Sequence, residues 1–242
     1  MYKFFKAIMD RLLALLGLII LFFPLAIVAL AIKLDSKGPA VFKQERIGKD
    51  GKPFMLYKFR TMKTTTVQFD YNHPVIEDSN KNLTRVGRTI RKLKIDEFLQ
   101  LLNVLKGDMS LIGPRPLMAV YLEHYEPWEM QKLSVKPGMS GASQVKGNGH
   151  LSSIERSYYD VKYAKKVSLW RDAEILFKTV GVMLVGEEHY LKKVPEYEIE
   201  RMRREYETAT ARKRLSLIIF ERNRQYSGRR SELVSATTQL KI

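Results

Sequence analysis

An uninterrupted apolar segment near the N-terminus constrains this chain more than any other feature. From Leu12 to Ile32 no residue is charged or strongly polar. At about 1.5 Å per residue, a helix of this length would be about 30 Å long, close to the thickness of one hydrocarbon core. A signal peptide has a shorter apolar stretch of roughly 7 to 15 residues, so we expect the segment to be retained. The sequence therefore predicts a membrane helix.

The residues around this helix leave its topology open. Basic side chains stand on both sides, and an excess of Lys and Arg normally marks the cytoplasmic side. They are Lys3, Lys6 and Arg11 before the helix and Lys33, Lys37, Lys43, Arg46 and Lys49 after it. Pro24, near the middle, cannot donate a backbone hydrogen bond, so we expect a kink at the bilayer midplane. A helix-break-helix hairpin with both flanks on one side and a kinked spanning helix fit this pattern equally well.

The charge balance favours anionic partners. The 242 residues include 42 Lys and Arg and 26 Asp and Glu, a formal net charge of +16. Such a charge suits phosphates, acidic lipid head groups or nucleic acid. The chain has no cysteine, which excludes a disulfide framework and thiolate metal sites. At this length we expect one globular domain with accessory segments.

Downstream of the membrane helix, the pattern predicts a small hairpin and then a helix. Short apolar runs at 40–42 and 54–59 flank a turn-rich cluster. Residues 64–82 are polar, and we expect a surface loop there. Helical spacing of apolar residues then extends from Leu83 to Leu105, and Gly107 supplies a helix stop.

Loops and helices alternate after that stop. A helical pattern over 117–133 follows a loop at Gly113–Pro116, and a short strand is expected near Gln144 and Val145. Helical spacing returns over 152–186. Its expected core or membrane-facing residues are Tyr158, Val161, Trp170, Ile175, Leu176, Val180 and Met183.

Residues beyond Pro195 are dense in Arg and Glu. An apolar seam repeats at spacings of three and four until Lys213; it consists of Ile199, Met202, Tyr206 and Ala209. We expect a solvated or partner-binding helix and then a disordered tail from about Ser227. The chain is thus divided into a membrane helix at 1–33, a domain at 34–190 and a charged helix with a tail at 191–242.

A basic run leads directly to a pair of carboxylates. The run consists of Lys81, Arg85, Arg88, Arg91, Lys92 and Lys94, and Asp96 and Glu97 follow it. By itself such a run fits a solvated or head-group-facing helix as well as a binding site. A neighbouring positive charge lowers the pKa of a carboxyl group, and an ionised carboxylate can attack phosphorus or bind Mg²⁺. We therefore expect the basic residues to keep Asp96 and Glu97 ionised.

Asp96 and Glu97 are predicted to have separate roles. Adjacent side chains on a helix diverge, so the two cannot share one proton as a tight dyad would. If a helix begins near Ile95, both lie in its first turn, where the helix dipole favours anions. Acidic residues are equally common in first turns that have no function.

Arg115 lies between two prolines in the loop Gly113-Pro114-Arg115-Pro116. The prolines restrict the backbone on both sides of the arginine. A guanidinium on such a stiff support is suited to hold a phosphate through two parallel hydrogen bonds. An arginine in a proline-rich loop is more often a surface residue, so the loop alone is a weak signal.

Three segments together resemble one known family. The run from Lys94 to Pro116, KIDEFLQLLNVLKGDMSLIGPRP, resembles the signature of the bacterial sugar transferases, the monotopic polyprenyl-phosphate phosphoglycosyl transferases. The segments Tyr57–Met62 (YKFRTM) and Lys136–Gly141 (KPGMSG) resemble two further motifs of that family. The resemblance covers about residues 2 to 190.

The resemblance implies a set of site residues. Asp96 would be the nucleophile and a ligand of Mg²⁺, and Glu97 a supporting acid-base carboxylate. The phosphate-binding residues would be Lys58, Arg60, Arg91 and Arg115. Three positions depart from the family pattern: Phe23 and Lys94 stand where serine is common, and Ala142 where tryptophan is usual. Lys94 in particular cannot accept the hydrogen bond that a helix N-cap requires.

The resemblance also implies a fold and a reaction. The fold would be mainly α with a small β element, a re-entrant N-terminal helix broken at Pro24, and a compact catalytic domain at the cytoplasmic face of the bacterial inner membrane. The enzyme would transfer a sugar-1-phosphate from a nucleotide sugar, with UDP as the expected nucleotide, to undecaprenyl phosphate, and release a nucleoside monophosphate. This would be the first membrane step of exopolysaccharide or lipopolysaccharide assembly. Further expected partners are a second copy of the chain or downstream glycosyltransferases, and no nucleic acid.

Two non-catalytic functions compete with this one. A basic membrane-anchored scaffold of a polysaccharide assembly complex is the stronger alternative, and a membrane-tethered nucleic-acid binder is the weaker. A carboxylate pair inside the basic run serves neither of them. A P-loop, a nucleophile elbow and the Asp-x-Asp pair of metal-dependent glycosyltransferases are absent from the sequence.

Overall fold

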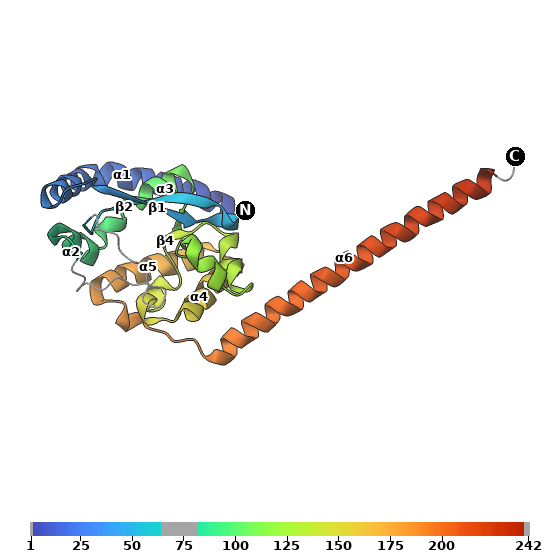
Figure 1. Cartoon of the computed structure of the whole chain (residues 1–242). Helices are drawn as coiled ribbons and strands as arrows, with labels where there is room; N and C mark the ends of the chain where they lie inside the picture. Colours follow the sequence, from blue (N-terminus) through green and yellow to red (C-terminus); the bar gives the residue numbers. More distant parts are fainter. Residues whose placement is uncertain (1, 64–81, 240–242) are drawn as a thin grey trace. The chain divides into compact units, whose positions relative to one another are not determined.

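The computed structural model describes residues 2–63 and 82–239, with side chains as far as residue 217. The surface loop expected at 64–82 lies almost entirely outside the described residues. The chain divides into two compact units, Met1–Val194 and Pro195–Ile242, which we describe separately (Figure 1).

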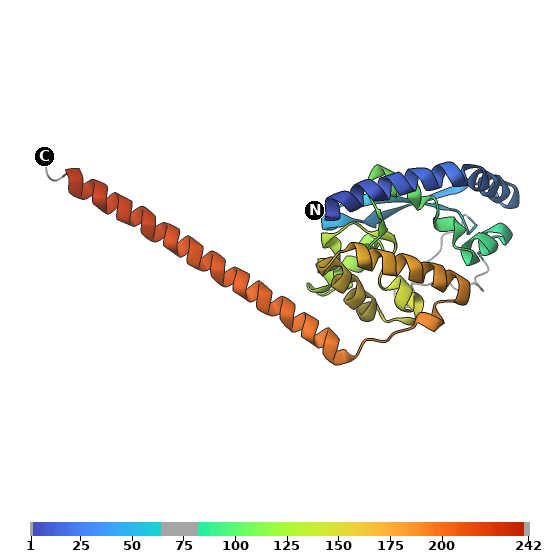
Figure 2. The ribbon, with the colours of Figure 1, turned by 180° about the vertical axis from the view of Figure 1, so that it is seen from behind.

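The first unit begins with the helix α1 (Tyr2–Asp35), which contains Pro24. Among the described residues it is the one helix long and apolar enough to cross a membrane. The predicted apolar helix is confirmed, and it is compatible with a membrane anchor. Figures 1 and 2 show that α1 changes direction along its length instead of continuing straight.

α1 presents one side to the protein and the other to its surroundings. Ala14, Leu25 and Ile32 are buried, and they pack in two apolar clusters that include Val104 and Phe59. The exposed large apolar side chains of α1 are Phe4, Phe5, Ile8, Met9, Leu12, Leu13, Leu15, Leu16, Ile19, Ile20, Phe22, Phe23, Ile27, Leu30 and Leu34. A helix with this much exposed apolar surface needs an apolar environment.

The predicted hairpin is confirmed. β1 (Val41–Ile47) and β2 (Pro53–Phe59) pair antiparallel from Val41 with Phe59 to Ile47 with Pro53. The turn η1 (Lys49–Gly51) joins the strands. Gly51 has φ of +76° there, a conformation that glycine adopts without steric cost.

Two helices and a turn replace the single helix expected over 83–105. They are α2 (Arg85–Lys92), the 3-10 turn η2 (Ile95–Glu97) and α3 (Gln100–Lys106). Lys94 adopts the left-handed conformation, with φ of 57°, which a continuous helix cannot contain. The predicted helix stop at Gly107 is confirmed. Its backbone is left-handed, with φ of +89°, and its amide donates to the carbonyls of Asn103 and Val104 at the end of α3.

A second small sheet follows, with two 3-10 segments between its strands. β3 (Ser110–Ile112) pairs parallel with β4 (Gly138–Ser140). The predicted helix over 117–133 is wrong; the chain forms η3 (Ala119–His124) and η4 (Glu129–Ser134), separated by Pro127, which cannot continue a helix. The strand predicted near Gln144 is also wrong, because η5 (Gln144–Lys146) is a 3-10 turn and η6 (Asn148–His150) follows it.

The helix expected over 152–186 is two helices, α4 (Ser153–Lys165) and α5 (Leu169–Val185). Ser152 forms a capping box with Glu155, and Ser168 caps α5. Of the expected residues, Tyr158, Val161 and Ile175 are buried, whereas Trp170, Leu176, Val180 and Met183 are exposed. The turn η7 (Glu188–Tyr190) follows α5.

Polar bonds fix the N-terminal part of α1 to the unit. The Lys6 ammonium lies 2.8 Å from a carboxylate oxygen of Asp172 in α5. The Ser110 hydroxyl in β3 donates to Asp10 at 2.5 Å. Asp10, Ser110 and Asp172 are all buried, so this part of α1 lies on protein.

The C-terminal part of α1 is fixed to the same unit by other bonds. The amide of Val86 in α2 donates to the Asp35 carboxylate at 3.0 Å. The Arg60 guanidinium donates to the carbonyl of Ser36 at 2.8 Å and also to that of Lys37. Both ends of α1 are therefore held by one compact body.

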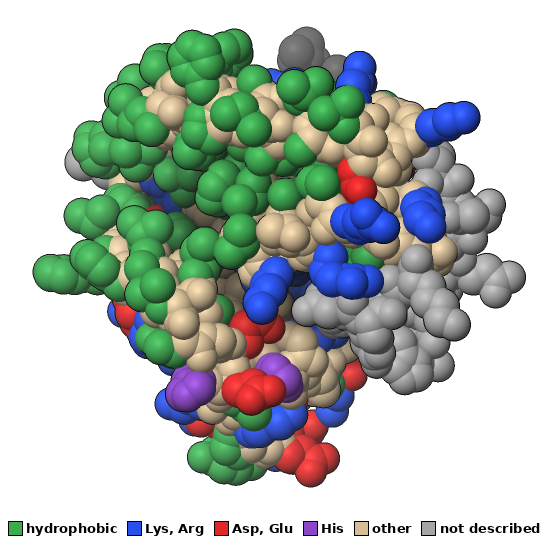
Figure 3. Space-filling model, turned by 90° about the vertical axis from the view of Figure 1, so that its left-hand side faces the viewer, with side chains coloured by type: hydrophobic (Ala, Val, Ile, Leu, Met, Phe, Trp, Pro, Cys, Tyr) green, Lys and Arg blue, Asp and Glu red, His purple; other side chains and the backbone are tan. Residues whose placement is uncertain are grey.

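The first unit has a mainly helical fold with two small sheets. The mainly helical fold and the hairpin were predicted, and the parallel pair of β3 and β4 was not. Figure 3 shows hydrophobic side chains gathered over one side of the face it presents, next to a group of Lys and Arg. α1 and α5 contribute most of the exposed large apolar residues; those of α5 are Leu169, Trp170, Leu176, Phe177, Val180, Met183, Leu184 and Val185.

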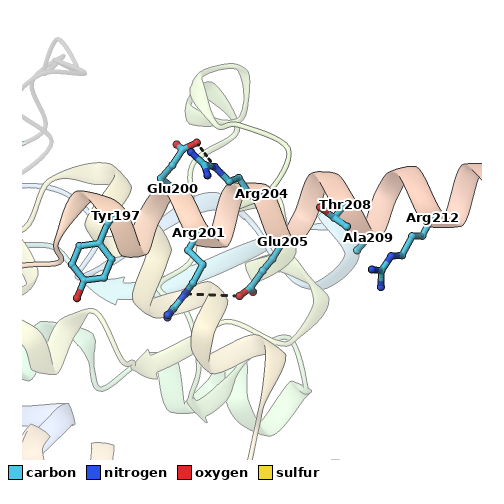
Figure 4. A pocket seen from close by; sticks show the side chains of 8 residues that line it. All are labelled: Tyr197, Glu200, Arg201, Arg204, Glu205, Thr208, Ala209 and Arg212. Atoms are coloured by element: carbon cyan, nitrogen blue, oxygen red, sulfur yellow. Dashed lines mark hydrogen bonds and ion pairs between the residues drawn. The ribbon is translucent and has the colours of Figure 1, made fainter.

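The second unit is a single long helix, α6 (Glu196–Gln239). The helix α6 is drawn as far as Gln239, and the disordered tail expected from about Ser227 stays a prediction. A hollow on this helix has all its lining residues on α6 itself (Figure 4): Tyr197, Glu200, Arg201, Arg204, Glu205, Thr208, Ala209 and Arg212. Such a hollow has a wall on one side only, and we place no site there.

Candidate active site

Asp96 and Glu97 occupy the short turn η2 between α2 and α3. The left-handed residue Lys94 ends one helix and begins this turn, and its side chain makes no capping bond. The condition that a helix begins near Ile95 is met only by a three-residue 3-10 turn, since α3 begins at Gln100. The turn packs against β2, and the Asp96 side chain is buried there at 7% exposure.

The surroundings of Asp96 favour its protonated form. Burial, and next the charge of Glu97, raise the pKa of Asp96 to about 6, while Lys58 and Arg91 oppose the shift. The expectation that the basic residues keep the pKa of this carboxyl low is therefore wrong. Loss of hydration on burial outweighs the attraction of the neighbouring cations.

Glu97 meets the opposite conditions. Burial acts to raise its pKa, but Arg115, Lys94 and Lys58 together hold the pKa of Glu97 below its usual range. The Arg115 guanidinium donates to Glu97 Oε1 at 3.1 Å. Glu97 in turn raises the pKa of Arg115. The expected ionisation by neighbouring cations is thus confirmed for Glu97.

The loop that carries Arg115 is held by two backbone bonds. The Gly113 amide donates to the Ser140 carbonyl at 2.8 Å, and the Gly138 amide donates to the Pro114 carbonyl at 2.9 Å. A Cβ added at Gly138 would lie 2.0 Å from the backbone nitrogen of Gly113, so only glycine allows this approach. The arginine is therefore presented from a fixed backbone.

Buried charges support the same loop from behind. Asp160 of α4 accepts hydrogen bonds from the backbone amides of Ser143 and Arg115. The Lys132 ammonium donates to the Ser157 hydroxyl at 2.8 Å, and burial lowers the pKa of Lys132 to about 8 although Asp160 opposes the shift. The sequence analysis missed Asp160 and Lys132, because neither belongs to a charged run or a recognised motif.

Of the predicted phosphate-binding residues, three surround the carboxylates. Lys58 acts on both Asp96 and Glu97, and Arg91 acts on Asp96; Arg115 bonds Glu97. Burial, and next Arg46, lower the pKa of Lys58. Arg60 is placed differently, since its guanidinium donates to the carbonyls that follow α1.

Two further residues at this site were missed by the sequence analysis. Arg46 of β1 is among the charges that act on Lys58. Glu187 accepts hydrogen bonds from the Lys94 ammonium at 3.0 Å and from the Asn148 side-chain amide at 3.1 Å. No sequence pattern links 187 to 94; the fold alone brings them together.

The donor set around Asp96 suits only one mode of metal binding. No cluster of three or more His, Asp or Glu side chains that could hold a metal occurs among the described residues. Magnesium is commonly held by one or two carboxylates together with substrate phosphates. Asp96 and Glu97, with three cations nearby that attract phosphate, fit that mode.

Comparison with known proteins shows the family to which the chain is similar. The profile of the family described as bacterial sugar transferase matches residues 1–186. A UDP-N-acetylgalactosamine-undecaprenyl-phosphate N-acetylgalactosaminephosphotransferase of Aeromonas hydrophila is 42% identical over 193 residues, which are 76% of this chain and 45% of that protein. A sugar transferase of Bacillus subtilis (strain 168), EpsL, is 45% identical over 169 residues, 70% of this chain and 80% of that protein.

A third relative is a UDP-glucose:undecaprenyl-phosphate glucose-1-phosphate transferase of Caulobacter vibrioides. It is 40% identical over 194 residues, 76% of this chain and 72% of that protein. The chain thus spans less than half of the Aeromonas protein and about three quarters of the other two. The family match covers residues 1–186 of the first unit, Met1–Val194, and so includes Asp96, Glu97 and Arg115. The chain belongs to the bacterial sugar transferase family.

Proposed function

We propose that this protein transfers a sugar-1-phosphate from a UDP-sugar to undecaprenyl phosphate. The observation that carries the proposal is a buried carboxyl, Asp96, beside an ionised carboxylate, Glu97, and three phosphate-attracting cations. The names of the Aeromonas and Caulobacter relatives couple a UDP-sugar with undecaprenyl phosphate, which supports both substrates here. A non-catalytic scaffold needs no such buried carboxyl, whose ionisation is costly.

The reaction would have two steps at one phosphorus atom. A carboxylate oxygen of Asp96 attacks the sugar-proximal phosphorus, and the bond from this phosphorus to the nucleoside monophosphate breaks. An oxygen of the lipid phosphate then attacks the same phosphorus and displaces the Asp96 carboxylate. The products are uridine monophosphate and a polyprenyl-diphosphate sugar. Dividing the displacement in this way lets the soluble product leave before the lipid phosphate reacts.

The surrounding residues would supply charge and proton transfer. Lys58, Arg91 and Arg115 neutralise the diphosphate, whose charge must be offset during transfer. Glu97, held ionised by Arg115, accepts a proton from the lipid phosphate. Magnesium would be held by Asp96 and the substrate phosphates, and when bound it supplies further positive charge to the diphosphate.

We further propose that α1 enters the membrane and returns on the same side. Its N-terminal part is bonded to α5 and β3, its C-terminal Asp35 is bonded to α2, and the next residue, Ser36, is bonded to Arg60 just after β2. Because one compact body holds both ends, that body would have to lie on both sides of the bilayer if α1 spanned it. A break at Pro24 resolves this geometry. With the exposed apolar residues of α1 and α5 in the bilayer, the site would lie at the lipid head groups, on what we propose is the cytoplasmic face of the inner membrane.

Product release without lipid tests the proposed chemistry. Purified protein mixed with a UDP-sugar should release about one equivalent of uridine monophosphate and gain the mass of a phosphosugar on the peptide that contains Asp96. Asp96→Asn should abolish both signals. If monophosphate appears only after lipid is added, the transfer is direct. If a panel of UDP-sugars yields none even with lipid, the scaffold function is favoured.

A further inference from the structure

Arg46 is a partly buried arginine next to the candidate active site. Neither the Lys94–Pro116 motif nor the family resemblance assigns it a role. It lies on β1, where its guanidinium donates to the Pro116 carbonyl at 3.3 Å and to the Gln44 side-chain oxygen at 2.7 Å. Its Nε is buried and has no hydrogen-bond partner among the described residues. A buried donor without a partner costs free energy, so this arginine is incompletely satisfied by the protein.

The charges around Arg46 add to that cost. Burial, and next repulsion from Arg115, lower the pKa of Arg46 to about 10, while Tyr121 and Glu97 act in the opposite direction. The negative charge of Glu97 is already bonded by Arg115. Arg46, Lys58 and Arg115 share one site with Arg91 and Lys94, and these five cations outnumber the three carboxylates there, Asp96, Glu97 and Glu187. An anionic ligand would remove this imbalance.

The backbone places Arg46 firmly at this position. Side chains on one face of a strand recur every second residue, so Gln44 and Arg46 share a face with Lys58, the cross-strand neighbour of Phe42. The Ile47 amide donates to the Leu117 carbonyl at 2.7 Å. This bond and the one to Pro116 join β1 directly to the end of the Arg115 loop. Arg46 is thus as rigidly presented as Arg115.

We propose that Arg46 is a second phosphate-binding arginine, which grips the diphosphate of the sugar nucleotide together with Arg115. The inference rests on the proposed function and adds a donor-binding residue to it. A guanidinium can hold a phosphate through two of its donors. In Arg46 both terminal nitrogens already donate within the protein, whereas Nε has no partner among the described residues.

The test compares Arg46→Gln and Arg46→Lys with the wild type in the full chain. For Arg46→Gln we expect the KM for the UDP-sugar to rise at least tenfold, while the KM for undecaprenyl phosphate stays within twofold. Inhibition by uridine monophosphate should weaken in parallel. Arg46→Lys, which keeps the charge but loses the planar fork, should give an intermediate KM. Lys43→Gln is the matched control, because Lys43 lies on the same strand, is exposed, and points to the opposite face.

A binding measurement separates ligand contact from structural support. The thermal stability of the wild type should increase with added UDP-sugar, and that increase should shrink in Arg46→Gln. A donor KM within twofold of the wild type would overturn the proposal. So would a lower kcat with an unchanged donor KM, which would indicate support of the Arg115 loop, or a change in the lipid KM alone. If the wild type itself releases no monophosphate, the proposed function fails instead.

Discussion

Asp96 and Glu97 are adjacent in sequence, yet the fold gives them opposite acidities. The Glu97 carboxylate reaches Arg115, so a strong charged hydrogen bond compensates its lost hydration. Asp96 is bonded by no side chain among the contacts that shift its pKa, and burial dominates. Glu97 is therefore held ionised, while Asp96 is about half protonated at pH 6. A weakly hydrated carboxylate is a better nucleophile than one already bound to a guanidinium.

The pH dependence of the first step should report Asp96. Because attack requires the ionised carboxylate and its pKa is about 6, kcat/KM for monophosphate release should increase from pH 5 to about pH 7 and then level off. Stopped reactions over pH 5 to 8 measure this. Glu97→Gln removes a charge that raises the pKa of Asp96, so its acidic limb should shift to lower pH even though its rate falls. A flat profile would contradict the assignment of Asp96.

Asp96→Asn should stabilise the fold at neutral pH. The folded state binds the Asp96 proton more tightly than the unfolded state, whose pKa is near 3.8. The wild type therefore loses stability as pH rises from about 4 to about 6, and the loss is about 3 kcal/mol above that window for a shift of about 2 units. The Asn variant escapes this loss. Melting temperatures in detergent should nearly coincide at pH 4 and diverge at pH 7.5, with the variant higher; equal temperatures at both would contradict the burial cost.

Short-range sequence patterns located part of this site and could not locate the rest. The run from Lys94 to Pro116 carries Asp96, Glu97 and Arg115, so a motif sufficed for them. Arg46, Asp160 and Glu187 come from a strand, a helix and a turn that only the fold brings near the motif. The shift in the pKa of Asp96 was predicted in the wrong direction, because the sequence shows how many cations lie nearby but not that the carboxyl group is buried.

Elements whose limits depend on local residues were predicted well, and those limited by tertiary packing were not. Gly107 ends α3 as expected, because glycine readily adopts the left-handed conformation there. Leu93 and Lys94 are good helix formers, yet Lys94 takes that same conformation and separates α2 from η2. The sequence does indicate the break between α4 and α5, because Ser168 is a favourable helix N-cap residue and caps α5. The break was not predicted because the helical spacing of apolar residues continues across it.

The path of α1 can be tested directly, because the chain contains no cysteine of its own. Single cysteines at Lys3 and Lys37 flank the helix. If both ends are held by the first unit, as the bonds of Asp10 and Asp35 indicate, a membrane-impermeant thiol reagent should label both from the same side of sealed vesicles. The cysteine variants should retain transferase activity as a check on folding. Labelling from opposite sides would exclude the hairpin.

At the scale of the whole molecule, the first unit combines an apolar surface with a cationic site. The exposed residues of α1 and α5 suit the interior of a bilayer, and the group of Lys and Arg beside them suits its phosphate head groups (Figure 3). A lipid phosphate would then reach Asp96 without leaving the membrane plane, and a nucleotide sugar would arrive from water.

The second unit should be dispensable for chemistry. The family match ends at residue 186, and the first compact unit ends at Val194. The Val194 amide donates to the Glu155 carboxylate at 3.0 Å, so a chain that ends after Val194 keeps the bonds that close this unit. Such a chain should release monophosphate from a UDP-sugar at a rate within about threefold of the full chain in detergent. Its Asp96→Asn version should be inactive, as the matched control.

A truncated protein that melts at the same temperature as the first unit of the full chain but releases no monophosphate would show that α6 contributes to catalysis. Retained turnover would leave α6 free for contacts with other proteins, which the charged Arg and Glu residues along it would suit.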